Sequence, residues 1–168
     1  MNKLLIEHVP VEQLRPDPRN PRLHSERQLK QIARSIDTFG FNVPVLADRE
    51  GNLLAGHGRV EAARRLGFRE IPVVIWLEHL TPEQARAFSI ADNRLAETSS
   101  WDDRLLGEVL RDLATVELNF DLEATGFTMG EIDLRIEGLS EISAASPDPA
   151  DELAPAVGQP PISRPGDL

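Results

Sequence analysis

Short apolar runs alternate with amphipathic stretches in the first half of the chain, and this alternation predicts a core of strands and helices. Strands are predicted over residues 4–14, 41–47, 53–55 and 71–78. The last of these, IPVVIWLE, is the richest in β-branched and apolar residues, so we expect it at the centre of the sheet. The prolines of RPDPRNPR, residues 15–22, predict an extended loop.

A helix is predicted over residues 25–40, where apolar side chains recur at intervals of three and four. We expect Ser25 to be its N-cap and Gln28 to complete a capping box. Gly40 stands where a helix commonly ends in a glycine. The helix therefore carries both of its end signals in the sequence.

Helical spacing dominates the second half of the chain. Helices are predicted over residues 81–95, 101–115 and 128–138. Thr81 and Thr128 are the expected N-caps of the first and last of them. The order of elements thus predicts a small mixed α/β or α+β core with a helical C-terminal part.

The amino-acid composition of the chain changes after Gly138. Residues 139–168 hold 6 of the 13 prolines and almost no large apolar side chains. Such a composition cannot bury enough apolar surface to order the chain, so this segment is predicted to be a disordered linker.

A Gly-His-Gly-Arg corner precedes a short helix that ends before Gly67. Gly56 and Gly58 flank His57, and Arg59 falls in the first turn of the helix. The first backbone N–H groups of a helix are unpaired and carry partial positive charge, so glycines there let an anion approach. The arrangement suits a phosphate, with Arg59 as a bidentate clamp. It is equally compatible with a tight turn between a strand and a helix.

Two polar residues near the end of the helix over 81–95 are a second candidate site. Asp92 and Asn93 follow apolar helical positions. They are compatible with an ordinary polar helix end, or with a hydrated Mg²⁺ on a triphosphate. The second interpretation requires that Asn93 fold back near Gly56, which spacing does not decide.

The charge is unevenly distributed along the chain, whose net charge is −10. Residues 1–80 carry 12 Lys and Arg against 10 Asp and Glu, residues 81–138 carry 5 against 13, and residues 139–168 carry 1 against 5. We therefore expect a local anion-binding face on the N-terminal half, and no phosphate-backbone binding by the chain as a whole.

Composition excludes cysteine chemistry and disfavours a membrane protein. The chain has no cysteine, which excludes disulfides, cysteine–zinc sites and thiol catalysis. No apolar run approaches the roughly 20 residues of a membrane span, and the N-terminus lacks a signal-peptide pattern. We expect a soluble, cytoplasmic protein without a membrane partner.

Three motifs resemble those of the ParB N-terminal domain family, which shares its fold with sulfiredoxin. They are the Asn-Pro-Arg box at residues 20–22, the Gly-x-x-Arg-x-x-Ala box that starts at Gly56, and the later Asp92–Asn93 pair. The resemblance covers about residues 4–97. It implies a ParB/sulfiredoxin-like domain over residues 1–97, with a helical subdomain over 98–138. It also implies that the glycine box binds nucleotide phosphates.

The chain departs from partitioning ParB proteins at the same motifs. His57 and Gly58 replace the middle pair of their Gly-Glu-Arg-Arg corner, and Ala96 stands where they have an arginine. No helix-turn-helix domain with a basic face is expected to follow, so specific centromere binding is not expected. The catalytic cysteine of sulfiredoxin is missing, which excludes that reaction.

The stretch from IADNRLAE to TGFTMGEID resembles the ParB-like modules at the N-terminus of phage and bacterial DNA methyltransferases. Residues 163–168, SRPGDL, resemble the point where the methyltransferase domain of those proteins begins. The chain has no Asp/Asn-Pro-Pro-Tyr/Trp/Phe motif, so by itself it is not expected to methylate DNA. The resemblance implies a nucleotide-binding, DNA-associated accessory module of a methyltransferase or of a DNA partition or modification system.

Each candidate residue has an expected role in that interpretation. The nucleotide-binding set is Gly56, His57, Gly58, Arg59 and Asn93, with Asp92 as a metal ligand and Arg19 and Arg22 closing over the ligand or contacting DNA. The expected ligand is a nucleoside triphosphate, CTP or ATP, together with Mg²⁺. DNA is the expected partner, directly or through a fused methyltransferase.

Two alternatives stay open. The first is a metal-dependent nuclease, or an enzyme of NTP hydrolysis or phosphotransfer, in which His57 is a general base and Glu61 or Asp92 positions Mg²⁺. The second is an interaction module whose acidic helical half docks a basic partner. That module could also dimerise through the apolar stripe from Leu105 to Leu113, although packing of the stripe on its own core is the expected outcome.

Overall fold

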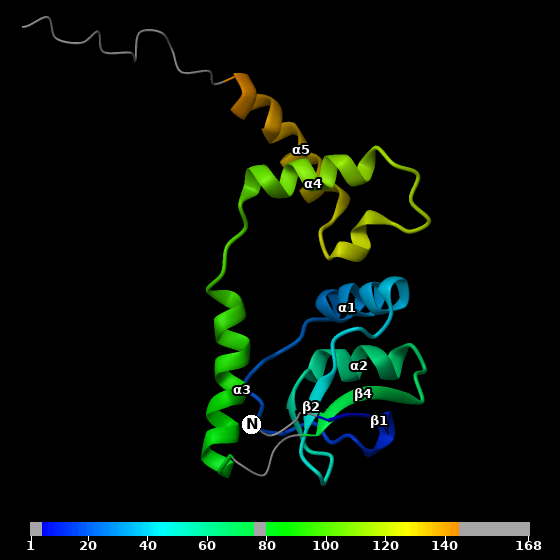
Figure 1. Ribbon diagram of the computed structural model, residues 1–168, viewed down its shortest axis with the longest axis vertical. Coiled ribbons are helices and arrows are strands. Elements are labelled where there is room, and N and C mark those ends of the chain that lie inside the picture. Colours follow the sequence, from blue (N-terminus) through cyan, green and yellow to red (C-terminus); the bar gives the residue numbers. More distant parts are fainter. Residues whose placement is uncertain (1–4, 76–79, 145–168) are drawn as a thin grey trace, which may run out of the picture.

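A computed structural model describes residues 5–75 and 80–144 and shows a four-stranded mixed sheet with helices on one side (Figure 1). The strands are β1 (Ile6–Pro10), β2 (Val45–Ala47), β3 (Leu53–Ala55) and β4 (Glu70–Ile75), in the order β1-β4-β2-β3. β4 pairs antiparallel with β1 and parallel with β2, while β2 and β3 form an antiparallel hairpin. The prediction that the strand near Ile71 is central is confirmed.

Five α-helices and two short 3₁₀ helices complete the described chain. They are η1 (Val11–Gln13), α1 (Glu26–Phe39), α2 (His57–Arg65), α3 (Pro82–Glu97), α4 (Asp103–Ala114), η2 (Leu122–Thr125) and α5 (Met129–Ala144). Figure 1 shows α2 on the sheet, α1 beyond α2, α3 beside the sheet, and the α4–α5 pair on the far side of α1. The expected class, a small mixed sheet with packed helices and a helical C-terminal part, is confirmed.

Two separate hydrophobic clusters hold these parts. The larger joins η1, the sheet and α2, and its members are Val11, Leu14, Val45, Ala47, Leu53, Val60, Ala63, Ile71 and Val73. The smaller joins α4, η2 and α5 through Leu110, Leu122 and Ile132. The helical part therefore has a core of its own.

The apolar stripe of α4 divides between that core and the surface. Leu110 is buried, and Leu106 and Leu113 pack against it. Leu105 and Val109, by contrast, are 53% and 48% exposed. Packing of the stripe on its own core thus accounts for three of its five residues.

Some boundaries differ from those that the sequence predicts. β2 begins only at Val45, because Pro44 has no N–H for the ladder and the backbone N–H of Asn42 donates to Gly40 O at 3.0 Å instead of to a strand. α5 continues through Ala144, past Gly138, whereas a linker was expected from residue 139. The rest of that expected linker, residues 145–168, lies outside the described residues, as do residues 76–79 of the predicted central strand.

Ser25 is confirmed as the N-cap of α1, and its replacement is expected to weaken the helix. Ser25 Oγ accepts a hydrogen bond from Gln28 N at 3.1 Å. The expected capping box is wrong at its other half, since Gln28 Oε1 lies 3.0 Å from His24 Nδ1. We expect Ser25→Ala to lower the free energy of unfolding by about 1 kcal/mol and Ser25→Asp to keep it, as measured by urea unfolding. Equal losses in both variants would contradict a capping role.

α3 differs from the other helices because none of its 16 residues is buried. Its start is fixed by a complete capping box between Thr81 and Gln84, as predicted. Its body lies against β3, and its C-terminal end carries Asp92 and Asn93. Within residues 5–75 and 80–144, no helix has the length and apolar character of a membrane span.

Candidate functional site

The three sequence motifs converge on one cavity of about 170 Å³ at the N-terminus of α2. Its lining residues are Asn20, Arg22, His24, Gln28, Ile32, Gly56, His57, Gly58, Arg59, Asp92 and Asn93. We call this cavity the corner pocket. α3 thus folds back along the sheet and brings Asn93 to the same pocket as Gly56, which the sequence left undecided.

Gly56 occupies a backbone position that only glycine fits well. Its φ is +94°, in the left-handed region, and a Cβ there would lie 2.6 Å from Val45 Cγ1. No side chain caps α2 at this residue. The N-terminal N–H groups of α2 are therefore left for a ligand or for water at the mouth of the corner pocket.

Gly58 serves helix packing. A Cβ on Gly58 would lie 3.0 Å from both His24 Cε1 and Ile32 Cδ1. The missing side chain lets α2 approach Ile32 of α1 and His24 in the segment that precedes α1. The glycine that replaces a bulkier residue of the partitioning proteins thus has a structural reason in this chain.

Arg59 is half-buried and incompletely paired. Its Nη2 donates to Pro44 O at 3.3 Å, and its Nε is buried without a hydrogen-bond partner among the described residues. Burial lowers the pKa of Arg59, and the neighbouring carboxylate of Asp92 opposes that shift. A buried donor without a partner costs about 1–3 kcal/mol, more for a charged group, so the geometry favours an anion here.

His57 is engaged with the backbone of the proline-rich loop. Asp17 N donates to His57 Nε2 at 3.2 Å, so this nitrogen is an acceptor and carries no proton. Burial lowers the pKa of His57, the charge of Asp17 raises it, and His24 lowers it further. The lone pair that a general base would use is therefore already committed to holding residues 15–22 against α2.

This contact predicts a pH-dependent stability. The pKa of folded His57 lies below its ordinary value of 6.5, so the unfolded chain binds the proton more tightly. Stability is then full above pH 6.5 and falls as the pH drops from 6.5 toward the folded pKa. Burial is the largest cause of the lowered pKa, and the hydrogen bond from Asp17 N, which protonation breaks, contributes about 0.5–1.5 kcal/mol to the loss. Urea unfolding on either side of pH 6.5 measures it.

His57→Gln is the matched control for that measurement. Its amide oxygen can accept from Asp17 N, but the side chain does not titrate. The wild-type chain should lose stability at low pH relative to this variant. A parallel pH dependence in both proteins would contradict the assignment to His57.

Arg22 joins the proline-rich loop to the end of α3. Its Nη1 lies 2.6 Å from Glu97 Oε1, and its backbone N donates to Asn20 Oδ1 at 3.2 Å. Asn93 Nδ2 donates to Ser89 O at 2.8 Å. The Arg22–Glu97 ion pair therefore places a guanidinium beside the corner pocket and couples it to α3.

Two predicted site residues lie elsewhere. Arg19 lines the grooves between the proline-rich loop, β3 and α3, and is not among the residues that line the corner pocket. Glu61 lies one turn further along α2, where its Oε1 lies 3.0 Å from Arg65 Nε. Among the described residues, no group of three or more His, Asp or Glu side chains is arranged to hold a metal ion.

Two lining residues were missed by the sequence analysis. His24 was given no role, and Gln28 was assigned to a cap, yet their side chains contact each other in the corner pocket. His24 lies just before Ser25, the N-cap of α1, and Gln28 lies in the first turn, so the pair spans the start of the helix. This contact is recognised as part of a site only once α2 is known to pack against this end of α1.

Comparison with known families and proteins agrees with this geometry. Residues 1–94 match the ParB N-terminal domain, and residues 104–165 match the ParB-methyltransferase HTH domain. The second match is to a helix-turn-helix domain, whereas the sequence analysis expected no such domain with a basic face. The matched segment is acidic, so the match concerns the type of domain and not the charge of its surface.

Two curated relatives differ in how much of them the chain covers. The ParB-like nuclease domain-containing protein YnaK of Escherichia coli K12 is 45% identical over 82 residues, which are 49% of this chain and 93% of YnaK. The probable chromosome 2-partitioning protein ParB of Deinococcus radiodurans is 30% identical over 122 residues, which are 70% of this chain but only 40% of the relative.

A solved structure shares the fold. The C-terminally truncated chromosome-partitioning protein ParB of Caulobacter crescentus, complexed with CTP-γ-S, aligns with a TM-score of 0.67 at 20% identity. The alignment covers 83% of this chain and 82% of that one. Because 83% of the chain is more than residues 1–97, the alignment extends beyond the sheet domain.

Proposed function

The chain belongs to the ParB N-terminal domain family, and from that premise we propose that it is a nucleotide-binding, DNA-associated module. The ligand is a nucleoside triphosphate, CTP or ATP, and the phosphates lie in the corner pocket. The observation that carries the proposal is the buried Nε of Arg59, which has no hydrogen-bond partner among the described residues and lies at a helix N-terminus without a side-chain cap. A phosphate oxygen supplies the missing acceptor there.

The other lining residues have complementary roles in this proposal. The backbone from Gly56 to Arg59 cradles the phosphates, and Asn93 hydrogen-bonds them from α3. Asp92 is the one carboxylate that lines the corner pocket, which suits a hydrated Mg²⁺ carried by the triphosphate. Arg22 contacts the same phosphates from the proline-rich loop.

The partners follow from the two family matches. The D. radiodurans relative is described as a chromosome-partitioning protein, and the second matched domain is described as part of a ParB-methyltransferase. We propose that this chain acts on DNA in a methyltransferase, partition or modification system. Residues 81–138 carry 5 Lys and Arg against 13 Asp and Glu, so this segment repels phosphates. We therefore propose that phosphates bind to the N-terminal half.

Calorimetric titration of the full chain tests the ligand. CTP, ATP and their diphosphates are added with and without Mg²⁺. Saturable binding of at least one triphosphate supports the proposal, and tightening by Mg²⁺ supports the role of Asp92. Heats of dilution alone with all four nucleotides would contradict it.

A nuclease is the second candidate, because the E. coli relative carries that word in its description. In this alternative the corner pocket would hold a scissile phosphate. Incubation of the full chain with supercoiled and linear DNA in Mg²⁺ or Mn²⁺ distinguishes the two. Cleavage that disappears in an Asp92→Asn variant favours the nuclease, and intact DNA favours the binding module.

A further inference from the structure

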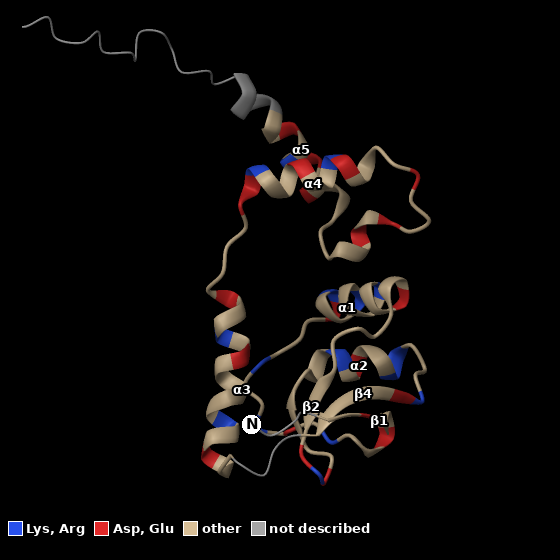
Figure 2. Cartoon of the chain, in the orientation of Figure 1, with Lys and Arg blue, Asp and Glu red and all other residues tan. Residues whose placement is uncertain are grey.

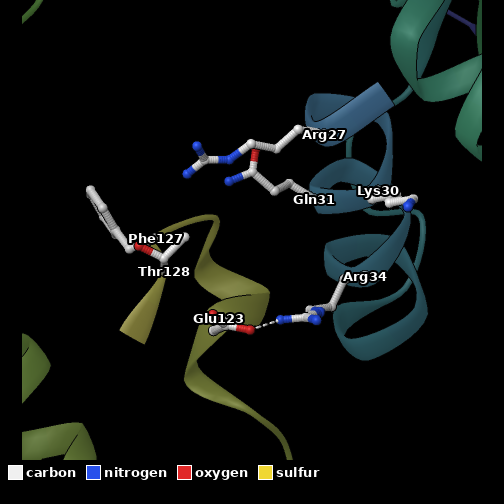
Figure 3. A pocket seen from close by; sticks show the side chains of 7 residues that line it. All are labelled: Arg27, Lys30, Gln31, Arg34, Glu123, Phe127 and Thr128. Carbon is white, nitrogen blue, oxygen red and sulfur yellow. Dashed lines mark hydrogen bonds and ion pairs between the residues drawn. The ribbon is translucent and has the colours of Figure 1, made fainter. Parts of the chain in front are cut away.

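A second, larger cavity lies between α1 and the helical part. Its volume is about 370 Å³, and it is lined by Arg27, Lys30, Gln31, Arg34, Glu123, Phe127 and Thr128. We call it the α1 pocket. It shares no lining residue with the corner pocket. Figure 3 shows Arg27 and Gln31 extending from α1 toward Phe127 and Thr128, and Arg34 meeting Glu123 at the other end.

The cations of the α1 pocket lie on one side of the helix. Arg27, Lys30 and Arg34 are spaced three and four residues apart, which places them on a common face. Leu29 and Ile36 are buried on a different face, where α1 packs on α2. Because η2 packs against α1, part of this basic face is turned toward protein (Figure 2).

The two walls of the α1 pocket are tied to each other. Arg34 forms an ion pair with Glu123, and Gln31 Nε2 donates to Gly126 O at 2.7 Å. Both contacts cross from α1 to η2 and its C-cap. The pocket is therefore held open at a defined width.

Its remaining positive charge has no close acidic partner among the described residues. Within residues 5–75 and 80–144, neither Arg27 nor Lys30 makes a hydrogen bond or an ion pair, and each acts on a carboxylate only at longer range. Arg27 lowers the pKa of Glu131 after the hydrogen bonds from Thr128, and Lys30 lowers that of Glu26 after the hydrogen bond and charge of Arg65. Glu131, the carboxylate on which Arg27 acts, accepts hydrogen bonds from Thr128 N and Thr128 Oγ1 at 2.8 Å. That carboxylate serves the N-cap of α5 and forms no ion pair with Arg27 among the described residues, so the N–H donors of Arg27 are left for a ligand.

Phe127 adds an apolar wall. Arg135 lies over its ring at 4.7 Å from the centroid, and Trp101 meets it edge-on at 6.0 Å. These contacts hold the ring in place beside the cations. Cations next to a fixed aromatic ring are a combination that binds phosphate and base together.

We propose that the α1 pocket binds a phosphate ester, separately from the corner pocket. Arg27 pairs with the phosphate, Gln31 borders it, and Phe127 contacts the organic part. Lys30 adds positive charge at the rim, where Figure 3 shows its side chain turned away from Phe127. The volume lies within the range of small-ligand sites, so a free nucleotide fits, and the open side also admits a backbone phosphate of DNA. Both sources present the same chemistry. A ligand here contacts α1 and the helical part at once and thereby fixes their relative position.

Nitrogen-15 NMR titration of the full chain tests the proposal with three probes: inorganic pyrophosphate, CTP and a short DNA duplex. The Gln31 side-chain amide and the Thr128 N–H report on the α1 pocket, while the Gly56 and Gly58 N–H groups report on the corner pocket. We expect saturable shifts at Gln31 and Thr128 with at least one probe. Shifts confined to Gly56 and Gly58 would overturn the α1 pocket and leave the proposed function intact.

A charge-matched pair of variants separates the pocket from general electrostatics. Arg27→Gln with Lys30→Gln should weaken the response at Gln31 and Thr128 roughly fivefold to tenfold. Arg104→Gln with Arg111→Gln removes the same charge from α4 and should leave it unchanged. Equal weakening in both pairs, or none in the first, would overturn the proposal. If the Arg27→Gln, Lys30→Gln variant loses the response to pyrophosphate and CTP, the ligand is a free phosphate compound. If it loses only the response to the duplex, the ligand is a DNA phosphate.

Discussion

Arg59→Ala is expected to weaken triphosphate binding roughly 10–100-fold while the chain stays folded. Arg59 is half-buried, its Nε has no partner within the described chain, and Asp92 lies close enough to affect its pKa. A charge-assisted hydrogen bond in such a place is worth about 1.5–3 kcal/mol, because water does not compete for it. Calorimetric titration with the triphosphate that the wild-type chain binds measures the loss directly.

Two further variants keep this prediction specific. Arg59→Lys retains the charge but loses the fork, so it should recover only part of the affinity. Arg104→Ala makes the same deletion on α4, where Arg104 pairs with Glu108, and should leave the affinity unchanged. Thermal unfolding of each variant shows whether it is folded. Wild-type affinity in a folded Arg59→Ala chain would remove the corner pocket from the nucleotide site.

The sequence predicted those features whose causes lie within a few residues. Thr81 accepts from Gln84 N three residues away, and Gly40 ends α1 through its own N–H to Ile36 O. The centrality of β4 is likewise local, since it could be inferred from a run of apolar and β-branched residues, of which Ile71 and Val73 are buried. Capping and burial patterns of this kind depend on spacing along the chain, so they can be derived before the fold is known.

The site depended on contacts between distant segments and was therefore only partly predictable. The motif residues were recognised one segment at a time, but their meeting in one cavity requires α3 to turn back beside β3. The Arg22–Glu97 ion pair spans 75 positions, and no local pattern announces it. Arg19 was assigned to the site from the sequence but does not line the corner pocket. Arg22, three residues later, lines that pocket, whereas Arg19 lines other grooves.

The same limit explains the α1 pocket. Arg27, Lys30 and Arg34 look like an ordinary solvated helix face in the sequence. Only the tertiary structure shows that η2 stands opposite them and that Arg34 forms an ion pair with Glu123 there, whereas Arg27 and Lys30 form none within the described chain. A helical wheel identifies which side chains share a face but does not identify what that face meets.

Gly56→Ala is expected to lower the free energy of unfolding by roughly 2–5 kcal/mol and to reduce nucleotide binding. The φ of +94° costs an L-residue about 1–2 kcal/mol. The added Cβ would also lie 2.6 Å from Val45 Cγ1, and Val45 is a fully buried residue of β2 that cannot move aside freely. Overpacking of this kind adds about 1–3 kcal/mol. Urea unfolding gives the stability term.

Gly67→Ala separates the two causes. Gly67 follows the other end of α2 with φ +74°, but a Cβ there would have no heavy atom within 4 Å. It should therefore show the backbone strain alone, about 1–2 kcal/mol, and leave nucleotide binding intact. The difference between the variants measures the contact with Val45, because both change a glycine of positive φ at an end of one helix. If the two variants lost equal stability, β2 would have yielded to the methyl group, and the close approach of Gly56 to the sheet would not be what shapes the pocket.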